Sequence, residues 1–183
     1  MSKIKRLLQS YCKFIAIPWR IDAAAAQRVI FCVYNENEEL LIRAKIDEFE
    51  IATRTSGNEW AVFDLTDTFP DWLAGQRYAK SYFKKPQLLS TLMPNYLANI
   101  KQEFEKFLQA EAVNEKTVVA LKGVGSLFGF LKVKEVVDTL APLVRGRLLV
   151  FFPGSFEDNN YRLLDGYDGW NYLAVPITAD KEF

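Results

Sequence analysis

The stretch Val29-Ile30-Phe31-Cys32-Val33-Tyr34 decides the fold class, because apolar side chains fill it without a break. A strand with one face in water alternates apolar and polar residues, whereas a strand covered on both faces does not. The stretch therefore predicts a strand that is buried on both faces of a sheet. Cys32 lies inside the run and is interpreted as a small core residue rather than a disulfide partner.

Four more strands are expected later in the chain. They lie at residues 60–65, 117–121, 148–152 and 172–177. The third of these is expected to end at Pro153 and Gly154, and Pro176 suggests that the last lies at a sheet edge, because proline cannot donate a ladder hydrogen bond. Between the strands, apolar residues recur at helical spacing and predict amphipathic helices. One such helix covers about residues 3–16 and ends before Pro18.

Strands that alternate with helices predict an α/β fold. We expect a three-layer domain in which helices flank a mostly parallel sheet of about five strands. The 183 residues suit one domain, residues 1–183, better than two small ones. No repeat, low-complexity tract or linker divides the sequence.

The charges balance, because 23 lysine and arginine residues match 23 aspartate and glutamate residues in number. Proteins that bind nucleic acid usually carry a basic excess, so the overall charge does not favour that class. Two segments are nevertheless basic: residues 1–20, which contain no acid, and the cluster Arg77, Lys80, Lys84 and Lys85. Solvated helix faces explain such segments most simply. Direct DNA contact through these two segments is an alternative.

The cysteine count and the lack of long apolar runs predict a compartment. The chain has two cysteines and no pattern of a secretory signal peptide. No apolar run approaches the length of a membrane span. We therefore expect a soluble cytoplasmic protein that makes no membrane contact.

The residue types that most catalytic sites need are missing. The chain has no histidine, which excludes Ser-His and Cys-His nucleophilic pairs and histidine-based zinc sites. It has no Gly-Lys pair for a Walker A loop and no acid-x-Lys triplet of the restriction-nuclease type. We therefore expect no catalytic residue, no metal site, no cofactor and no enzymatic activity.

One glycine loop follows the strand predicted at residues 117–121. Gly123, Gly125 and Ser126 lie between that strand and a helix, where backbone N–H groups of an α/β protein can hold an anion. The glycine spacing does not fit a dinucleotide-binding loop. A structural turn is the favoured interpretation, and a degenerate site for a nucleotide or another anion is the alternative.

A second unusual segment is dense in polar and aromatic side chains, namely Asn159, Asn160, Tyr161, Arg162, Trp170 and Tyr172. Asparagine favours turns, and tyrosine, tryptophan and arginine are enriched at protein interfaces. The segment is interpreted as a packed loop that covers the sheet. A partner-binding surface is the sharper hypothesis.

Several stretches together are similar to one known family. They are Gly123-Val-Gly-Ser-Leu-Phe-Gly-Phe130, Gly146-Arg-Leu-Leu-Val-Phe-Phe-Pro-Gly154, Asn159-Asn-Tyr-Arg-Leu-Leu-Asp165 and Asp168-Gly-Trp-Asn-Tyr-Leu-Ala-Val-Pro-Ile177. These stretches resemble the BrxB family of BREX (bacteriophage exclusion) proteins. The N-terminal helix and the run Val29 to Tyr34 share this resemblance, so it extends over the whole chain.

The resemblance implies a role in defending bacteria against phage. It implies an assembly or adaptor subunit that acts with other BREX proteins, which include an ATPase, a DNA methyltransferase and a phosphatase-like protein of the PglZ type. The PglZ-type protein is the expected direct partner, and DNA is expected to be contacted only indirectly or through a complex. The resemblance supplies no catalytic residues.

Overall fold

A computed structural model of the chain describes residues 2–20, 22–166 and 169–180. In these residues the helices are α1 (Lys3–Ile15), α2 (Glu39–Arg43), α3 (Ile46–Thr55), α4 (Thr68–Ala74), α5 (Ala79–Lys84), α6 (Met93–Ala110) and α7 (Val133–Leu140). The strands are β1 (Val29–Tyr34), β2 (Glu59–Asp64), β3 (Thr117–Lys122), β4 (Arg147–Glu157), β5 (Asn160–Leu163), β6 (Trp170–Asn171) and β7 (Val175–Ile177). Across the described part of the chain, no helix is long and apolar enough to cross a bilayer.

The sheet runs in the order β2-β3-β4-β1-β7, and neighbouring strands in this series are parallel. β7 lies at one end of the series, as Pro176 suggested, although it is shorter than residues 172–177. Beyond Phe152, β4 continues and pairs with β5, which in turn pairs with β6; both of these pairings are antiparallel. The sheet is therefore mixed and has seven strands.

The prediction of an α/β fold is confirmed, but a mostly parallel sheet of about five strands is wrong in strand number and in direction. The error arises at Pro153 and Gly154, where β4 was expected to end and instead continues. A Cβ atom on Gly154 would collide with the carbonyl oxygen of Arg162 in β5. Glycine at this position thus lets a further strand pair closely with β4, and the sequence pattern of β4 itself carries no sign of that partner.

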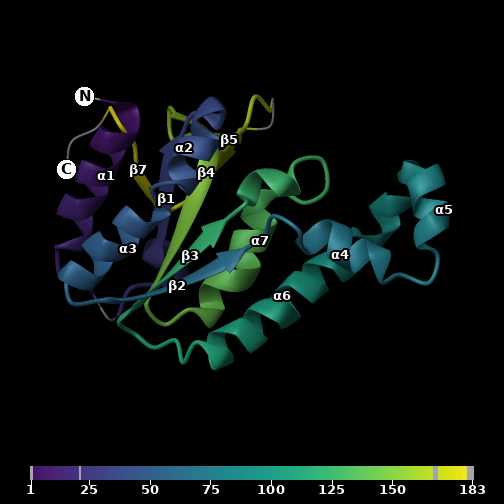
Figure 1. Cartoon of the computed structure of the whole chain (residues 1–183), viewed down its shortest axis with the longest axis horizontal. Coiled ribbons are helices and arrows are strands. Elements are labelled where there is room, and N and C mark those ends of the chain that lie inside the picture. The colour runs from purple at the N-terminus through teal and green to yellow at the C-terminus, as the bar shows by residue number, and fades with distance from the viewer. Residues whose placement is uncertain (1, 21, 167–168, 181–183) are drawn as a thin grey trace.

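β1 is buried on both faces, as its unbroken apolar run predicted. Val29, Phe31 and Val33 join one hydrophobic cluster, and the alternate side chains of β1 join another. The first cluster contains residues of α6 and α7, and the second contains residues of α1 and α3. In Figure 1 these two pairs of helices accordingly lie on opposite sides of the sheet.

The helix expected over about residues 3–16 is α1. Its buried apolar side chains are spaced by three or four residues, at Ile4, Leu7, Tyr11 and Ile15. The side chain of Ser2 caps its first turn by accepting a hydrogen bond from the backbone N–H of Lys5 at 3.3 Å. Through these buried side chains α1 packs against α3 and β1.

Residues 75–92 form a helical arm that projects from the rest of the molecule beyond α4 (Figure 1). The arm contains α5 and a 3-10 helix, η3 (Pro86–Leu92), which leads into α6. Neither element contains a buried residue. The arm therefore adds nothing to the two hydrophobic clusters.

Candidate functional site

The carboxyl ends of the parallel strands meet at one edge of the sheet, where α/β proteins usually bind ligands. Asp64 ends β2, Lys122 ends β3, and the two residues are paired in register. The Lys122 ammonium lies 3.2 Å from Oδ2 of Asp64. The other carboxylate oxygen of Asp64 accepts hydrogen bonds from the backbone N–H of Thr66 at 2.9 Å and from its hydroxyl at 2.6 Å.

This ion pair continues toward β1 through α2. The Arg43 side chain donates to Oγ1 of Thr66 at 3.1 Å and to Glu39 at 2.7 Å. The hydroxyl of Tyr34, at the end of β1, donates to the second carboxylate oxygen of Glu39. A continuous polar network thus connects the ends of β1, β2 and β3. We refer to Tyr34, Glu39, Arg43, Thr66, Asp64 and Lys122 as the edge network.

Interactions within the edge network stabilise the charged forms of Asp64 and Arg43. Partial burial favours a higher pKa for Asp64, but hydrogen bonds from Thr66 and the charge of Lys122 outweigh it and lower the pKa below its ordinary value. The hydrogen bond to Glu39 raises the pKa of Arg43. Burial, followed by the bond to Glu39, raises the pKa of Tyr34. All three shifts move the pKa away from neutral pH. A general acid or base works best with a pKa near the ambient pH, so these shifts favour a structural role over proton transfer.

The predicted glycine loop packs directly on this network. Gly123 has a φ of +75°, and a Cβ atom there would lie 2.6 Å from the backbone nitrogen of Thr66 and 2.9 Å from Oδ1 of Asp64. The hydroxyl of Ser126 lies 2.7 Å from the carbonyl oxygen of Gly123 and 3.0 Å from that of Leu65. The loop is therefore a tight turn after β3 that packs against the residues directly following β2.

A pocket of about 240 Å³ opens beside the loop, lined by Glu36, Glu39, Arg43, Gly123, Gly125, Ser126, Pro153 and Leu164. The structure thus brings the three residues proposed for anion binding, Gly123, Gly125 and Ser126, to one wall. Arg43 is the cation of the pocket, but Glu39 already pairs with it. Two carboxylates line the same pocket and oppose an anionic ligand.

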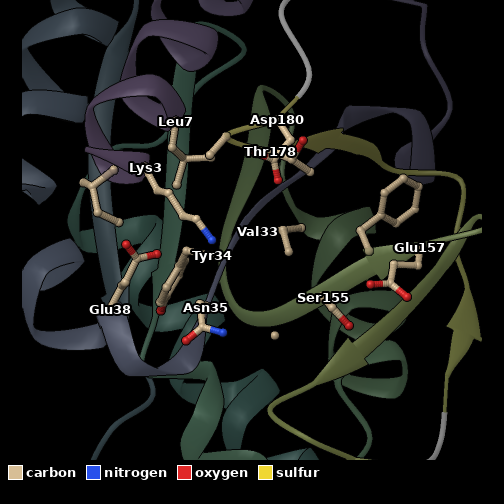
Figure 2. Close-up of a pocket in the computed structure, with 14 residues that line it drawn as sticks. Lys3, Leu7, Val33, Tyr34, Asn35, Glu38, Ser155, Glu157, Thr178 and Asp180 are labelled. Carbon is tan, nitrogen blue, oxygen red and sulfur yellow. The ribbon is translucent and has the colours of Figure 1, made fainter. Parts of the chain in front are cut away.

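A second pocket, of about 290 Å³, lies at the other side of the end of β1, between α1, β4 and the residues that follow β7. Figure 2 shows the Lys3 amine pointing into it, with Tyr34 and Asn35 beneath, Glu157 to the right and Asp180 above. Its lining residues come from four separated segments of the chain, within residues 3–7, 33–38, 154–157 and 178–180. No sequence pattern joins such segments, so sequence reasoning missed this pocket. Within the described residues, no group of three or more Cys, Asp or Glu side chains could hold a metal ion.

The six residues proposed for a partner interface do not share one environment. Side chains of β5 alternate, so that Asn160 and Arg162 are exposed whereas Tyr161 is fully buried. The Tyr161 ring lies 5.3 Å from the ring of Trp170, centroid to centroid. Tyr161 therefore belongs to the hydrophobic core, and its inclusion in a partner-binding surface is wrong for this structure.

The remaining interface candidates lie in β5 and β6 or directly beside these strands, with Asn159 in the turn between β4 and β5. Asn159 is exposed and has a φ of +63°, as a tight hairpin turn requires. Trp170 and Tyr172 are partly buried against the first cluster. Leu173, which sequence reasoning did not single out, is 76% exposed. We define the hairpin face as Asn159, Asn160, Arg162, Trp170, Tyr172 and Leu173. Tyr167 and Asp168 lie outside the described residues.

Comparison with known proteins identifies a family. The model of the family described as BREX protein BrxB matches residues 68–176, which is more than half of the chain. The match includes the glycine loop and the hairpin face, whereas α1 and β1 lie outside it. No curated protein and no solved structure matches. The chain belongs to the BrxB family of BREX proteins.

Proposed function

We propose that this chain is a non-enzymatic assembly or adaptor subunit of a BREX anti-phage complex, and that the PglZ-type protein is its direct partner. Membership of the BrxB family makes the chain a BREX phage-defence component that works with other BREX proteins. The adaptor role and the choice of partner are the further steps of the proposal.

The observation that carries the proposal is the hairpin face. Its backbone is held against the sheet by buried Tyr161, while Asn160 and Arg162 of the same strand point outward. Arg162 is exposed on β5, Trp170 of β6 is half-buried, and both are residue types enriched at interfaces. Leu173 adds an exposed apolar side chain just after β6. Because the backbone of the hairpin face is already ordered, binding there costs little conformational entropy.

The edge network supports the non-enzymatic part of the proposal. Its charged groups bond to one another at the position where an α/β enzyme usually binds its substrate. A catalytic group must instead reach a substrate atom. If the Asp64→Asn variant abolished a reaction of the purified chain with nucleotides, phosphomonoesters or DNA, the chain would be an enzyme and this part of the proposal would fail.

The test of the adaptor role is co-purification. Affinity-tagged chain is expressed with all other BREX proteins, and the proteins that elute with it are identified. We expect the PglZ-type protein in roughly stoichiometric amount. Arg162→Glu, combined with Leu173→Asp, is expected to abolish its recovery, because both changes place a negative charge on the hairpin face.

The matched control is Arg54→Glu, combined with Ile51→Asp, on the exposed side of α3, where Ile51 is 63% exposed. These two changes have the same chemistry at a distant surface and should leave co-purification intact. If both double variants bind alike while circular dichroism shows both folded, the hairpin face is not the interface. A chain that stays monomeric beside every BREX protein contradicts the adaptor role itself.

A second candidate function is a sensor for a nucleotide or another anion. The pocket beside Gly123, Gly125 and Ser126, with Arg43 in its wall, favours it. The pairing of Arg43 with Glu39 weighs against it. Calorimetry with ATP and with inorganic phosphate decides: heat of binding that is lost in Arg43→Ala supports the sensor, and no heat at millimolar ligand removes it.

A further inference from the structure

The arm, residues 75–92, is an ordered surface without a role in the core. Backbone hydrogen bonds hold its turns, such as Lys85 N–H to Ser81 at 2.9 Å and Leu88 N–H to Lys85 at 3.0 Å. No side chain of α5 or η3 is buried. Ordering a segment costs conformational entropy, and burial of side chains normally compensates for that cost. A partner that covers the arm would supply the missing burial.

The arm is cationic. Arg77, Lys80, Lys84 and Lys85 are all exposed, and no acidic residue occurs between Asp71 and Glu103. Outside the arm the balance is reversed, with 19 basic residues against 23 acidic ones. The neutral net charge of the whole chain therefore hides a local concentration of positive charge.

These cations are also unpaired, unlike the basic side chains of α2, α3, α6 and α7 that form ion pairs within their own helix. Those pairs join residues at a spacing of three or four and neutralise the basic side chains. Among the described residues, no carboxylate lies within 4.0 Å of the charged nitrogens of Arg77, Lys80, Lys84 or Lys85. Four exposed charges without counter-charges complement a polyanion.

Flat aromatic side chains lie among the four cations. Tyr78 is 57% exposed and Phe83 is 64% exposed. The Arg77 guanidinium carbon lies 5.3 Å from the centre of the Tyr78 ring. Exposed aromatic rings beside cations are the pairing that single-stranded nucleic acid uses, because bases stack on the rings while phosphates contact the charges.

We propose that the arm is a binding surface for single-stranded nucleic acid. The four cations contact phosphates, and Tyr78 and Phe83 stack on unpaired bases. A duplex fits less well, because its bases already stack on one another and cannot reach the rings. An acidic protein surface also fits less well, because interface cores are depleted in lysine, and three of the four cations are lysines. The helix α5 has six residues and spans about 9 Å, so the site covers only a few nucleotides.

The test uses the purified full chain and fluorescently labelled oligonucleotides at low salt. Anisotropy is measured with single-stranded oligo-dT and with a duplex of the same length. We expect tighter binding of the single strand and a log-log salt slope near about −3, for four phosphate contacts. Phe83→Ala is expected to weaken single-strand binding roughly tenfold or more, and Lys80→Ala with Lys84→Ala to make the slope shallower by about 1.4.

The matched control is Lys5→Ala with Lys13→Ala, which removes the same charge from two exposed positions of α1. It should leave binding unchanged. Three outcomes overturn the proposal: no single-strand binding at low salt, equal loss in the α1 control, or binding that does not respond to Phe83→Ala. Arm variants that lose a BREX protein partner while oligonucleotide binding persists unchanged would show that the arm is a protein-docking surface, which also overturns it.

Discussion

The ring of Tyr161 in β5 lies 4.6 Å from the ring of Phe31 in β1, centroid to centroid. Phe31 belongs to the strand that the sequence identified most clearly, and Tyr161 to a strand that the sequence did not predict. The contact packs β5 on β1, next to the edge of the parallel series. Tyr161 therefore holds the backbone of the hairpin face in place. It is fully buried, so it supports the proposed interface without contacting a partner itself.

Replacing Tyr161 with alanine is expected to destabilise the chain by about 3–5 kcal/mol, because a fully buried aromatic ring leaves a cavity. Tyr161→Phe should cost less than about 1 kcal/mol, since the hydroxyl makes only a long hydrogen bond, 3.5 Å, to the carbonyl of Ala174. Urea denaturation measures both values. A Tyr161→Ala chain as stable as the parent would contradict the role of this ring in the core.

Gly123→Ala should also be strongly destabilising, by more than about 2 kcal/mol. The added Cβ requires an unfavourable positive φ and approaches the backbone nitrogen of Thr66 to 2.6 Å. Gly129→Ala is the matched control: it has a similar φ of +81°, but nothing lies within 4 Å of its added Cβ. Thermal unfolding compares the two, and equal losses would mean that backbone conformation alone matters at Gly123.

The buried hydrogen bond between Tyr11 and Thr53 should respond unequally to removal of either partner. The hydroxyls lie 2.6 Å apart, and Thr53 also donates to the carbonyl of Phe49 at 2.8 Å. Tyr11→Phe leaves Thr53 bonded and should cost about 1 kcal/mol, whereas Thr53→Val leaves a buried Tyr11 hydroxyl unpaired and should cost about 1–3 kcal/mol. Denaturant titrations of the two variants give the order, and the reverse order would contradict this geometry.

The ionisation of Asp64 predicts a dependence of stability on pH. Its pKa is lower in the folded chain than in the unfolded one, so its contribution is complete above the ordinary aspartate pKa and is lost as the pH falls through the folded value. Relative to Asp64→Asn, the parent should be more stable at pH 7 and lose this advantage toward pH 3. The side chain is 43% exposed, so the contribution is below about 1 kcal/mol. A constant difference across this range would contradict the prediction.

The longer strands that sequence reasoning found contain a run of apolar residues. The run fills β1 and covers Val118 to Leu121 in β3, and the burial of these residues follows from their composition. β5 and β6 have four and two residues, too few for a periodic pattern to emerge. Their pairing depends on the missing side chain of Gly154, which lets β5 approach β4. That is a tertiary relationship, and no local propensity encodes it.

The candidate sites also divide into residues that are adjacent in sequence, which could be predicted, and residues that only the fold brings together, which could not. The glycine loop was found because its residues are adjacent in sequence, whereas the edge network joins residues from Tyr34 to Lys122 that only the parallel sheet brings together. Tyr161 was assigned to a surface because its residue type is enriched both at interfaces and in cores. Its burial follows from the alternation of β5, which could be used only once that strand was known.

The most direct test of the adaptor proposal is the mass of the species that the chain forms with the PglZ-type protein. The two purified proteins are mixed and analysed by size-exclusion chromatography with light scattering. We predict one peak with the summed mass of a complex, which the parent chain and the α3 control variant both form and the hairpin-face variant does not. Two separate peaks with the masses of the free proteins, for the parent chain at micromolar concentration, would contradict the proposal.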